Sequence, residues 1–381
     1  MHVGLILLSN HIGGTEKRFA NLFNYLAKNS KHEYSLVLPG GLLGKLIQQD
    51  ILQDSLPGLI RVFKRPPSSL FCKLPIQIFG FGVRGIDRLL YPLLVQELYS
   101  PRMMHHFHSF DVIHDAMSGI PAFPNRSLMT SRAFVLEAQG TGQTSKIKTD
   151  RVKLGILTQA FFNAASDRIA GRLGEEGVRP DRLFVSPGSF IDYGKTFVRD
   201  KEKLITFVGR MIPIKRPDLF VDVIERIARQ RRDFRAYMLG TGPLDNQIDD
   251  SIVQKGLADL IIRQFHPHPA EVLSRSLIFG SLQQSDNYHS QALMEAMACG
   301  CAIIASDVGE TWRLVSENVG FRVAPDPEEI AEKVNFLLDN PEEAVGMGIS
   351  ARQQVMKNHT VEAYACYLED LYEKAYGAFH H

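Results

Sequence analysis

The stretch Ser285-Asp286-Asn287-Tyr288-His289-Ser290-Gln291-Ala292-Leu293-Met294-Glu295-Ala296-Met297-Ala298-Cys299-Gly300 passes from a polar loop into a short helix rich in small residues. Its apolar residues stand at helical spacing, so one face of this helix would meet a core. A helix N-terminus presents free backbone N–H groups and a partial positive charge, which suits a phosphate. A carboxylate just inside the helix, here Glu295, suits a sugar hydroxyl. The stretch therefore predicts a site for a sugar nucleotide.

The composition is that of an ordinary globular chain. Its 381 residues are 45% hydrophobic and 22% charged, which is enough for two or three domains. The net charge of +1 gives no strong field toward nucleic acid, and no nucleic-acid partner is predicted. The four cysteines lack the spacing of a metal site. The apolar start 3–8 is short and favours a buried strand over a signal peptide. Without a run of about 18 apolar residues, the chain is predicted to be cytoplasmic.

A strand–helix alternation occurs twice, on either side of a polar segment of mixed charge at 193–203. In the first half we expect helices at 156–165 and 167–176, and strands at 3–8, 34–38, 110–114, 134–136 and 183–185. In the second half we expect long helices at 327–338 and 361–376, and strands at 204–208, 235–239, 261–265, 276–280 and 302–305. The pattern predicts two α/β domains joined by a linker.

Three features of the first half have two interpretations each. Gly13 and Gly14 would let the backbone approach a ligand phosphate, or they form a tight turn between strand and helix. His114 ends a strand, so it either faces a ligand or is a hydrogen-bonded loop histidine. The segment 61–106 mixes basic with aliphatic and aromatic residues. It is either an interfacial segment in peripheral contact with the inner membrane, or a pair of amphipathic helices of the first domain.

Several polar groups of the second half follow predicted strands. They are Arg210 with Lys215, Gly240-Thr241-Gly242, the loop near His266, the helix with Glu295, and 307–310. Two fixed cations beside a helix N-terminus can hold a diphosphate and stabilise the charge that grows as a glycosyl bond breaks. No metal ion or other cofactor is then expected, and no suitable Asp-x-Asp pair is present. The glycines lack the G-x-G-x-x-G continuation, which disfavours a dinucleotide-dependent oxidoreductase.

These motifs, in this order, resemble the retaining glycosyltransferases of the GT-B fold, family four (glycosyl transferases group 1). The similarity covers about 204–376, through 207–215, 239–244, 293–300 and 305–309, and is weaker in the first half. It implies an α/β protein with two Rossmann-like domains facing across a cleft. The implied ranges are an acceptor-binding domain at 1–194, a nucleotide-sugar-binding domain at 204–360, and a C-terminal helix at 361–381 that crosses back to the first domain.

The resemblance also implies roles for individual residues. Arg210 and Lys215 would bind the donor diphosphate, and Glu295 would bind the donor ribose; these three are the predicted catalytic residues. No metal site is implied. The remaining residues assigned to the donor are Gly13, Gly14, Gly240, Gly242, Asp286, Asn287, Gln291, Ala292 and Leu293.

Two departures from the family pattern concern the sugar. Asn287, with Asp286 beside it, stands where the family usually has a second glutamate, eight positions before Glu295. Gln139 stands where the family tends to have a histidine. Gln139 and His114 are the residues assigned to the sugar or the acceptor.

The predicted function is transfer of a sugar, of the hexosyl class, from a nucleotide-sugar donor to a glycan or lipid-linked acceptor. The expected setting is bacterial polysaccharide or cell-envelope assembly, at the cytoplasmic face of the membrane. The alternative is a catalytically inert nucleotide-sugar-binding or regulatory protein on the same fold. The presence of Arg210, Lys215 and Glu295 together favours the enzyme.

Overall fold

The structure is a computed structural model of the whole chain. It describes residues 1–7, 9, 12–53, 55–62, 107–116, 132–138, 159–286, 288 and 290–380, with backbone only at 61–62. The chain divides into two compact units. The first is Met1–Pro187 with Ala365–His381, and the second is Gly188–Tyr364. The divisions thus fall at 187/188 and 364/365, and the predicted linker 193–203 lies inside the second unit.

The first unit is built on a parallel sheet. Its described strands are ordered β3-β2-β1-β4-β5-β6-β7. The order reverses direction between β1 and β4, as in a Rossmann-like sheet. The elements are β1 (His2–Ile6), α1 (Gly14–Asn29), β2 (Glu33–Pro39), α2 (Gly40–Gln48), β3 (Leu59–Val62), β4 (Val112–Asp115), β5 (Ala133–Ala138), β6 (Phe161–Ala164), α7 (Asp167–Glu175) and β7 (Leu183–Val185), with a 3-10 turn η3 at Pro180–Arg182.

The prediction of a helix at 156–165 is wrong over the described residues Phe161–Ala164, which form strand β6. All four are buried, and the strand pairs in parallel with β5 and β7. A fully buried stretch this short, with Phe161, Phe162 and Ala164 apolar, has no periodicity that separates a strand from a helix. The next helix, α7, agrees with the expectation for 167–176, and Ser166 caps its N-terminus by accepting from the amide of Ile169.

The second unit repeats the design. Its described strands are ordered β10-β9-β8-β11-β12-β13, all parallel, with the reversal between β8 and β11. The strands are β8 (Glu202–Val208), β9 (Arg235–Leu239), β10 (Ile261–Gln264), β11 (Ser276–Ser281), β12 (Ala302–Ser306) and β13 (Gly320–Val323). The helices are α8 (Pro217–Ala228), α9 (Asp245–Gln254), α10 (Ala270–Leu273), α11 (Gln291–Ala298), α12 (Pro327–Asp339) and α13 (Pro341–Asn358), with 3-10 turns η4 (Tyr193–Lys195), η5 (Pro213–Lys215) and η6 (Thr311–Arg313).

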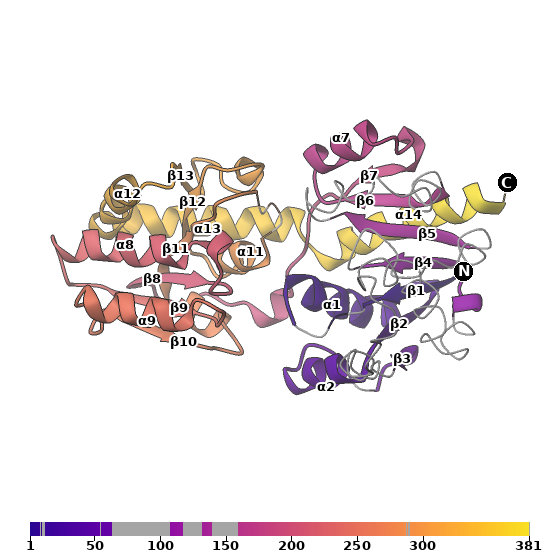
Figure 1. Ribbon diagram of the computed structural model, residues 1–381, viewed down its shortest axis with the longest axis horizontal. Helices are drawn as coiled ribbons and strands as arrows, with labels where there is room; N and C mark the ends of the chain where they lie inside the picture. The colour runs from indigo at the N-terminus through magenta and orange to yellow at the C-terminus, as the bar shows by residue number, and fades with distance from the viewer. Residues whose placement is uncertain are drawn as a thin grey trace, which may run out of the picture. The chain divides into compact units, whose positions relative to one another are not determined.

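Helices cover both faces of the second sheet. One apolar cluster joins α8, α9 and α12 to one face, and another joins α11 and α13 to the other. The last helix, α14 (Val361–His380, yellow in Figure 1), begins in the second unit, and its residues from Ala365 onward belong to the first. No helix within the described residues combines the length and apolar character needed to cross a bilayer.

Candidate donor site at the strand ends of the second unit

The loops after β8 and β11 are joined where the strand order of the second sheet reverses. The Lys215 ammonium, at the end of η5, donates a hydrogen bond of 2.8 Å to Oε1 of Gln283, two residues after β11. The next residue, Arg216, has left-handed backbone angles (φ 51°, ψ 50°), which are uncommon for any residue but glycine, and its guanidinium pairs with Asp218. In open α/β sheets this edge, beside the reversal, is where ligands bind.

Neither cation of this loop pairs with a carboxylate of any residue that the structure describes. Burial lowers the pKa of Lys215 to about 8, and the positive charge of Arg210 acts in the same direction. Arg210 is exposed, and its guanidinium forms no ion pair or side-chain hydrogen bond with any residue that the structure describes. The contact of Lys215 with Gln283 is to a neutral amide. An anionic ligand would therefore supply the countercharge that the described residues do not.

Gly240 and Gly242 bring the loop after β9 against the loop after β8. Gly240 has a φ of +143°, and a Cβ there would lie 2.0 Å from the carbonyl oxygen of Gly209. A Cβ on Gly242 would lie 2.4 Å from the carbonyl oxygen of Met211. The Met211 amide also donates to the Thr241 carbonyl at 3.2 Å. The close packing of the two loop backbones is enough to explain why both positions are glycine. Contact of these glycines with a donor stays a prediction.

The helix that carries Glu295 begins beside the start of the second unit. Ser290 caps α11, and its hydroxyl accepts from the Leu293 amide at 3.5 Å. The Gln291 side chain donates to the Phe190 carbonyl at 3.0 Å and accepts from the Ser189 hydroxyl at 3.2 Å. Of the amides assigned to the donor, those of Gln291 and Ala292 lie in the first turn, where no intrahelical acceptor exists. Glu295 is half-buried one turn further along.

Asp286 holds two loops together. Its Oδ1 accepts from the amide of Tyr288 at 3.0 Å and from the amide of Glu310 at 3.2 Å. Gly309 has a φ of +56°, and a Cβ on it would lie 2.2 Å from the Asp286 carboxyl carbon. The carboxylate therefore ties the loop before α11 to the loop after β12. Asn287, the other candidate for the missing glutamate, lies outside the described residues.

The corresponding edge of the first unit is occupied by its own side chains. The Gly13 amide donates to Oε2 of the buried Glu16 at 2.8 Å, and a Cβ on Gly13 would lie 2.9 Å from that oxygen. This cap supports the interpretation of Gly13 as a tight turn, because a carboxylate already occupies the helix start. Gly14 is the first residue of α1. Gln139 lies outside the described residues, as does the predicted segment 61–106 beyond its first two positions.

His114 is fully buried within a charged network. Its Nδ1 lies 2.6 Å from the hydroxyl of Tyr372, and its Nε2 lies 3.2 Å from Oε1 of Glu137. Oε2 of Glu137 accepts from the buried Arg18 at 3.0 Å, and Oε1 accepts from Asn163 at 2.5 Å. Burial would raise the pKa of Glu137, but Arg18, His114 and Asn163 together hold it below its usual value. This placement favours the hydrogen-bonded alternative for His114.

Sequence reasoning missed Arg18 and Glu137. A signal for each was present, because a charged residue at a core-facing position needs a partner. Arg18 precedes Leu22 by one helical turn on the apolar face of α1, and Glu137 interrupts an apolar strand.

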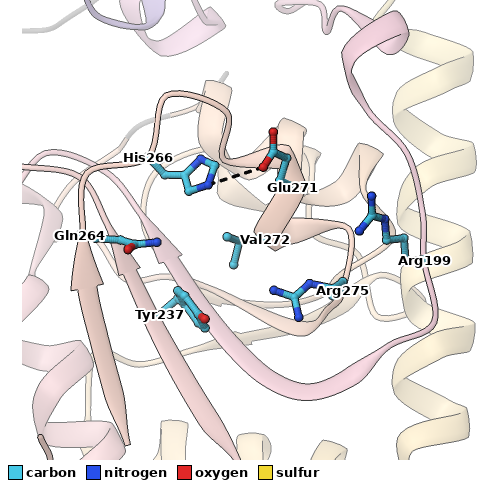
Figure 2. A pocket seen from close by; sticks show the side chains of 7 residues that line it. All are labelled: Arg199, Tyr237, Gln264, His266, Glu271, Val272 and Arg275. Carbon is cyan, nitrogen blue, oxygen red and sulfur yellow. Dashed lines mark ion pairs between the residues drawn. The ribbon is translucent and has the colours of Figure 1, made fainter.

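His266, near the predicted donor loop, borders a separate pocket of about 380 Å³. Its Nδ1 accepts from the His268 amide at 3.1 Å, and its Nε2 lies 3.7 Å from Glu271. In Figure 2 the polar ends of Tyr237 and Arg275 turn toward each other beneath this pair. Because Arg275 immediately precedes β11, the pocket extends toward the amino ends of the strands, away from Lys215. Among the described residues, no three His, Cys, Asp or Glu side chains are grouped so as to hold a metal ion.

The family model described as Glycosyl transferases group 1 matches residues 192–354, which contain Arg210, Lys215 and Glu295. Residues 192–354 belong to the group 1 glycosyl transferases. Similar relatives include the D-inositol 3-phosphate glycosyltransferase of Gordonia bronchialis, 29% identical over 49% of this chain and 47% of that protein. The poly(ribitol-phosphate) alpha-N-acetylglucosaminyltransferase of Staphylococcus aureus is 24% identical over 42% of this chain and 34% of its own. The chain thus spans half or less of the length of these relatives.

Solved structures extend the likeness of the group 1 glycosyltransferase segment to the whole chain, as a likeness of fold. Anabaena Alr3699/HepE in complex with UDP-glucose has a TM-score of 0.71 at 14% identity, over 97% of this chain and 99% of that one. Sucrose-phosphate synthase from Thermosynechococcus elongatus has a TM-score of 0.71 at 17% identity, over 99% of both chains. With its two Rossmann-like sheets, the chain has the GT-B fold.

Proposed function

We propose that this chain is a retaining, metal-independent glycosyltransferase. It would move a sugar from a nucleotide-sugar donor to a glycan or lipid-linked acceptor in bacterial polysaccharide or cell-envelope assembly. The observation that carries the proposal is the pair of cations, Arg210 and Lys215, at the reversal of the second sheet. They lie within the matched family segment and have no carboxylate partner among the described residues. The relatives named above are glycosyltransferases, which supports the reaction class.

The proposed chemistry follows from these charges. As the bond from the anomeric carbon to the diphosphate breaks, negative charge grows on the departing phosphate oxygen. Arg210 and Lys215 would stabilise that charge in place of a metal ion. The acceptor hydroxyl would bond to the anomeric carbon on the same face, and its proton would pass to the departing phosphate. Glu295 would hold the donor ribose and would take no proton.

The test is a panel of UDP-, GDP- and ADP-sugars, beginning with UDP-glucose because Anabaena HepE was solved with it. Thermal shift reports binding, and release of nucleoside diphosphate with and without EDTA reports turnover. We expect Lys215→Ala and Glu295→Gln each to lower turnover by about 10²-fold or more. Lys333→Ala on α12 is the matched control and should leave turnover unchanged.

Three outcomes decide between the alternatives. If both site variants keep the turnover of the unmodified chain, the site assignment is wrong. If turnover disappears in EDTA, metal independence is wrong. A donor that shifts the melting temperature but yields neither product nor hydrolysis would instead support the inert nucleotide-sugar-binding protein. The anomeric configuration of the product, measured by NMR, tests retention.

We further propose that the chain acts in the cytoplasm and contacts the inner membrane through 61–106. The basic and apolar composition of that segment supports this. Replacing its basic residues by glutamine should weaken co-sedimentation with anionic vesicles; unchanged co-sedimentation would reject the contact.

A further inference from the structure

Four exposed apolar side chains of the second unit gather in one groove. Val345, Ile349 and Met356 project from one side of α13 with exposed fractions of 37%, 54% and 44%. Val198, which is 49% exposed, faces them from the segment before β8. The groove has a volume of about 530 Å³. A hollow with several half-exposed apolar side chains is unusual on a soluble surface and indicates a binding site.

Two glycines make this part of the surface concave. A Cβ on Gly348 of α13 would lie 2.1 Å from the carbonyl oxygen of Gly300. Gly300 has a φ of +72°, and a Cβ there would lie 3.3 Å from the Val198 side chain. The absence of side chains at both positions lets α13 pack close to the turn after α11. No side chain fills the groove at these two positions, so the groove is deeper there.

The charges around the groove are mainly positive. Three cationic side chains line it, Arg199, Lys201 and Arg352, against one carboxylate. Lys201 donates to the carbonyls of Cys299 at 2.6 Å and Leu273 at 3.3 Å, and Arg352 donates to the carbonyl of Ala298. Both donate to carbonyls, neither pairs with a carboxylate among the described residues, and both have N–H groups left over. The exposed Arg199 has no carboxylate partner among the described residues.

We propose that this groove binds a single-chain lipid anion, with the alkyl chain along α13 and the acidic head at Arg199. The apolar side chains suit a hydrocarbon chain, since each methylene removed from water contributes about 0.8 kcal/mol. The excess of positive charge selects an anionic head. The surface of a flat bilayer fits less well, because a protein inserts into a bilayer with apolar side chains that protrude, whereas these line a groove. The groove lies next to Gly300, just after the C-terminal end of α11. None of its lining residues is assigned to the donor, so this proposal goes beyond the proposed function.

The test is calorimetric titration of the full chain with dodecyl phosphate below its micelle concentration and without nucleotide sugar. Dodecyltrimethylammonium has the same tail with the opposite charge, and inorganic phosphate has the head without the tail. We expect dodecyl phosphate to bind and the other two to bind at least about tenfold more weakly. Because no donor is present, the result does not depend on whether the proposed glycosyl transfer is correct.

Variants locate the site. Ile349→Glu places a carboxylate in the groove, and Arg199→Glu reverses the charge at its rim; each should weaken dodecyl phosphate at least about tenfold. The matched control is Val253→Glu on α9, which replaces another exposed apolar side chain (69% exposed) outside the groove. Arg199→Glu changes only an exposed side chain, so it remains informative if Ile349→Glu fails to fold. Equal binding of the cationic detergent, equal effects of all three variants, or binding to anionic vesicles alone would each overturn the proposal.

Discussion

The two Rossmann-like units treat charge differently at the carboxyl edges of their sheets. In the first unit, Glu137 is buried with Arg18 and His114, and its two oxygens accept from several donors. In the second unit, Lys215 contacts the neutral amide of Gln283, and neither Lys215 nor Arg210 pairs with a carboxylate among the described residues. The same topology therefore carries a closed network at one edge and uncompensated cations at the other. Paired buried charge is a structural feature, whereas unpaired charge at a strand end is a place for a ligand.

The closed network also holds the last helix to the first unit. Tyr372 of α14 contacts His114, and the hydroxyl of Tyr367, one turn earlier, donates to Asn163 at 2.7 Å. These two phenols join the network from a segment more than 200 residues away in the chain. We therefore expect the network to matter for stability, and the cations of the second unit to matter for binding.

The largest expected effect is that of Glu137→Leu. Removing this carboxylate leaves the buried Arg18 without its partner, which should cost about 3–5 kcal/mol of the free energy of unfolding. Urea denaturation followed by circular dichroism measures the loss. Trp312 is the chain's single tryptophan and lies in the second unit, so its fluorescence transition should move little.

A double variant separates charge from packing at this position. Arg18→Met with Glu137→Leu removes both charges and should recover most of the lost stability, because two apolar groups can replace a buried pair at little cost. If Glu137→Leu alone is neutral, the network is not what stabilises the first unit, and the comparison between the two edges fails.

The next effect is the pH dependence of donor binding. The pKa of Lys215 is lowered to about 8, so its charge is present below that pH and is lost as the pH rises through it. Donor affinity should therefore fall by up to about tenfold per pH unit above this pKa. Calorimetry between pH 6.5 and 9.5, roughly one and a half units on either side of 8, would show the decline.

Lys215→Arg provides the control, because arginine stays protonated across this range. Its alkaline decline should disappear, whatever its absolute affinity. If the donor affinity of the unmodified chain is constant up to about pH 9.5, the Lys215 charge is not used in binding. The contrast between a structural network in the first unit and ligand-binding cations in the second would then fail.

The smallest effect is expected for Asp286→Asn. The asparagine Oδ1 can still accept from the amides of Tyr288 and Glu310, so donor KM should stay within about threefold and the melting temperature should change little. Asp286→Ala should cost about 1–3 kcal/mol of stability, because it leaves two amides without their acceptor. A large rise in donor KM for Asp286→Asn, without a change in melting temperature, would instead assign this carboxylate to the sugar.

The sequence predicted the fold well where strand and helix periods were regular and bounded by glycine or proline. Strand 204–208 was placed within two residues of β8, and the short helix predicted within 285–300 is α11. Strand β6 was missed because Phe161–Ala164 does not alternate between apolar and polar faces: Asn163 shares its face with Phe161, and Phe162 and Ala164 are apolar. Its identity depends on pairing with β5 and β7, which a local pattern does not contain.

In the candidate site, the two cations could be predicted from the sequence. The structural contacts made by the residues around them could not. Lys215 and Arg210 follow a recognisable strand, so their shared edge was predictable. The hydrogen bond from Lys215 to Gln283 joins loops 68 residues apart, and only the sheet order brings them together. The sequence also does not show that Gly240 lies against Gly209, or Asp286 against Gly309. Gly240 and Asp286 were therefore assigned to the donor, although these contacts within the protein already explain why both residues are needed.

The left-handed backbone of Arg216 has a consequence for how this chain would respond to engineering. Glycine at that position would remove the steric cost of a positive φ, so a search for thermostable variants would tend to find it. Glycine would also give the loop of Lys215 more conformations to lose when an anion binds. The same substitution should thus raise the melting temperature while it weakens the ligand. Screens that score only the melting temperature would therefore select against a Lys215 loop that is already ordered for its ligand.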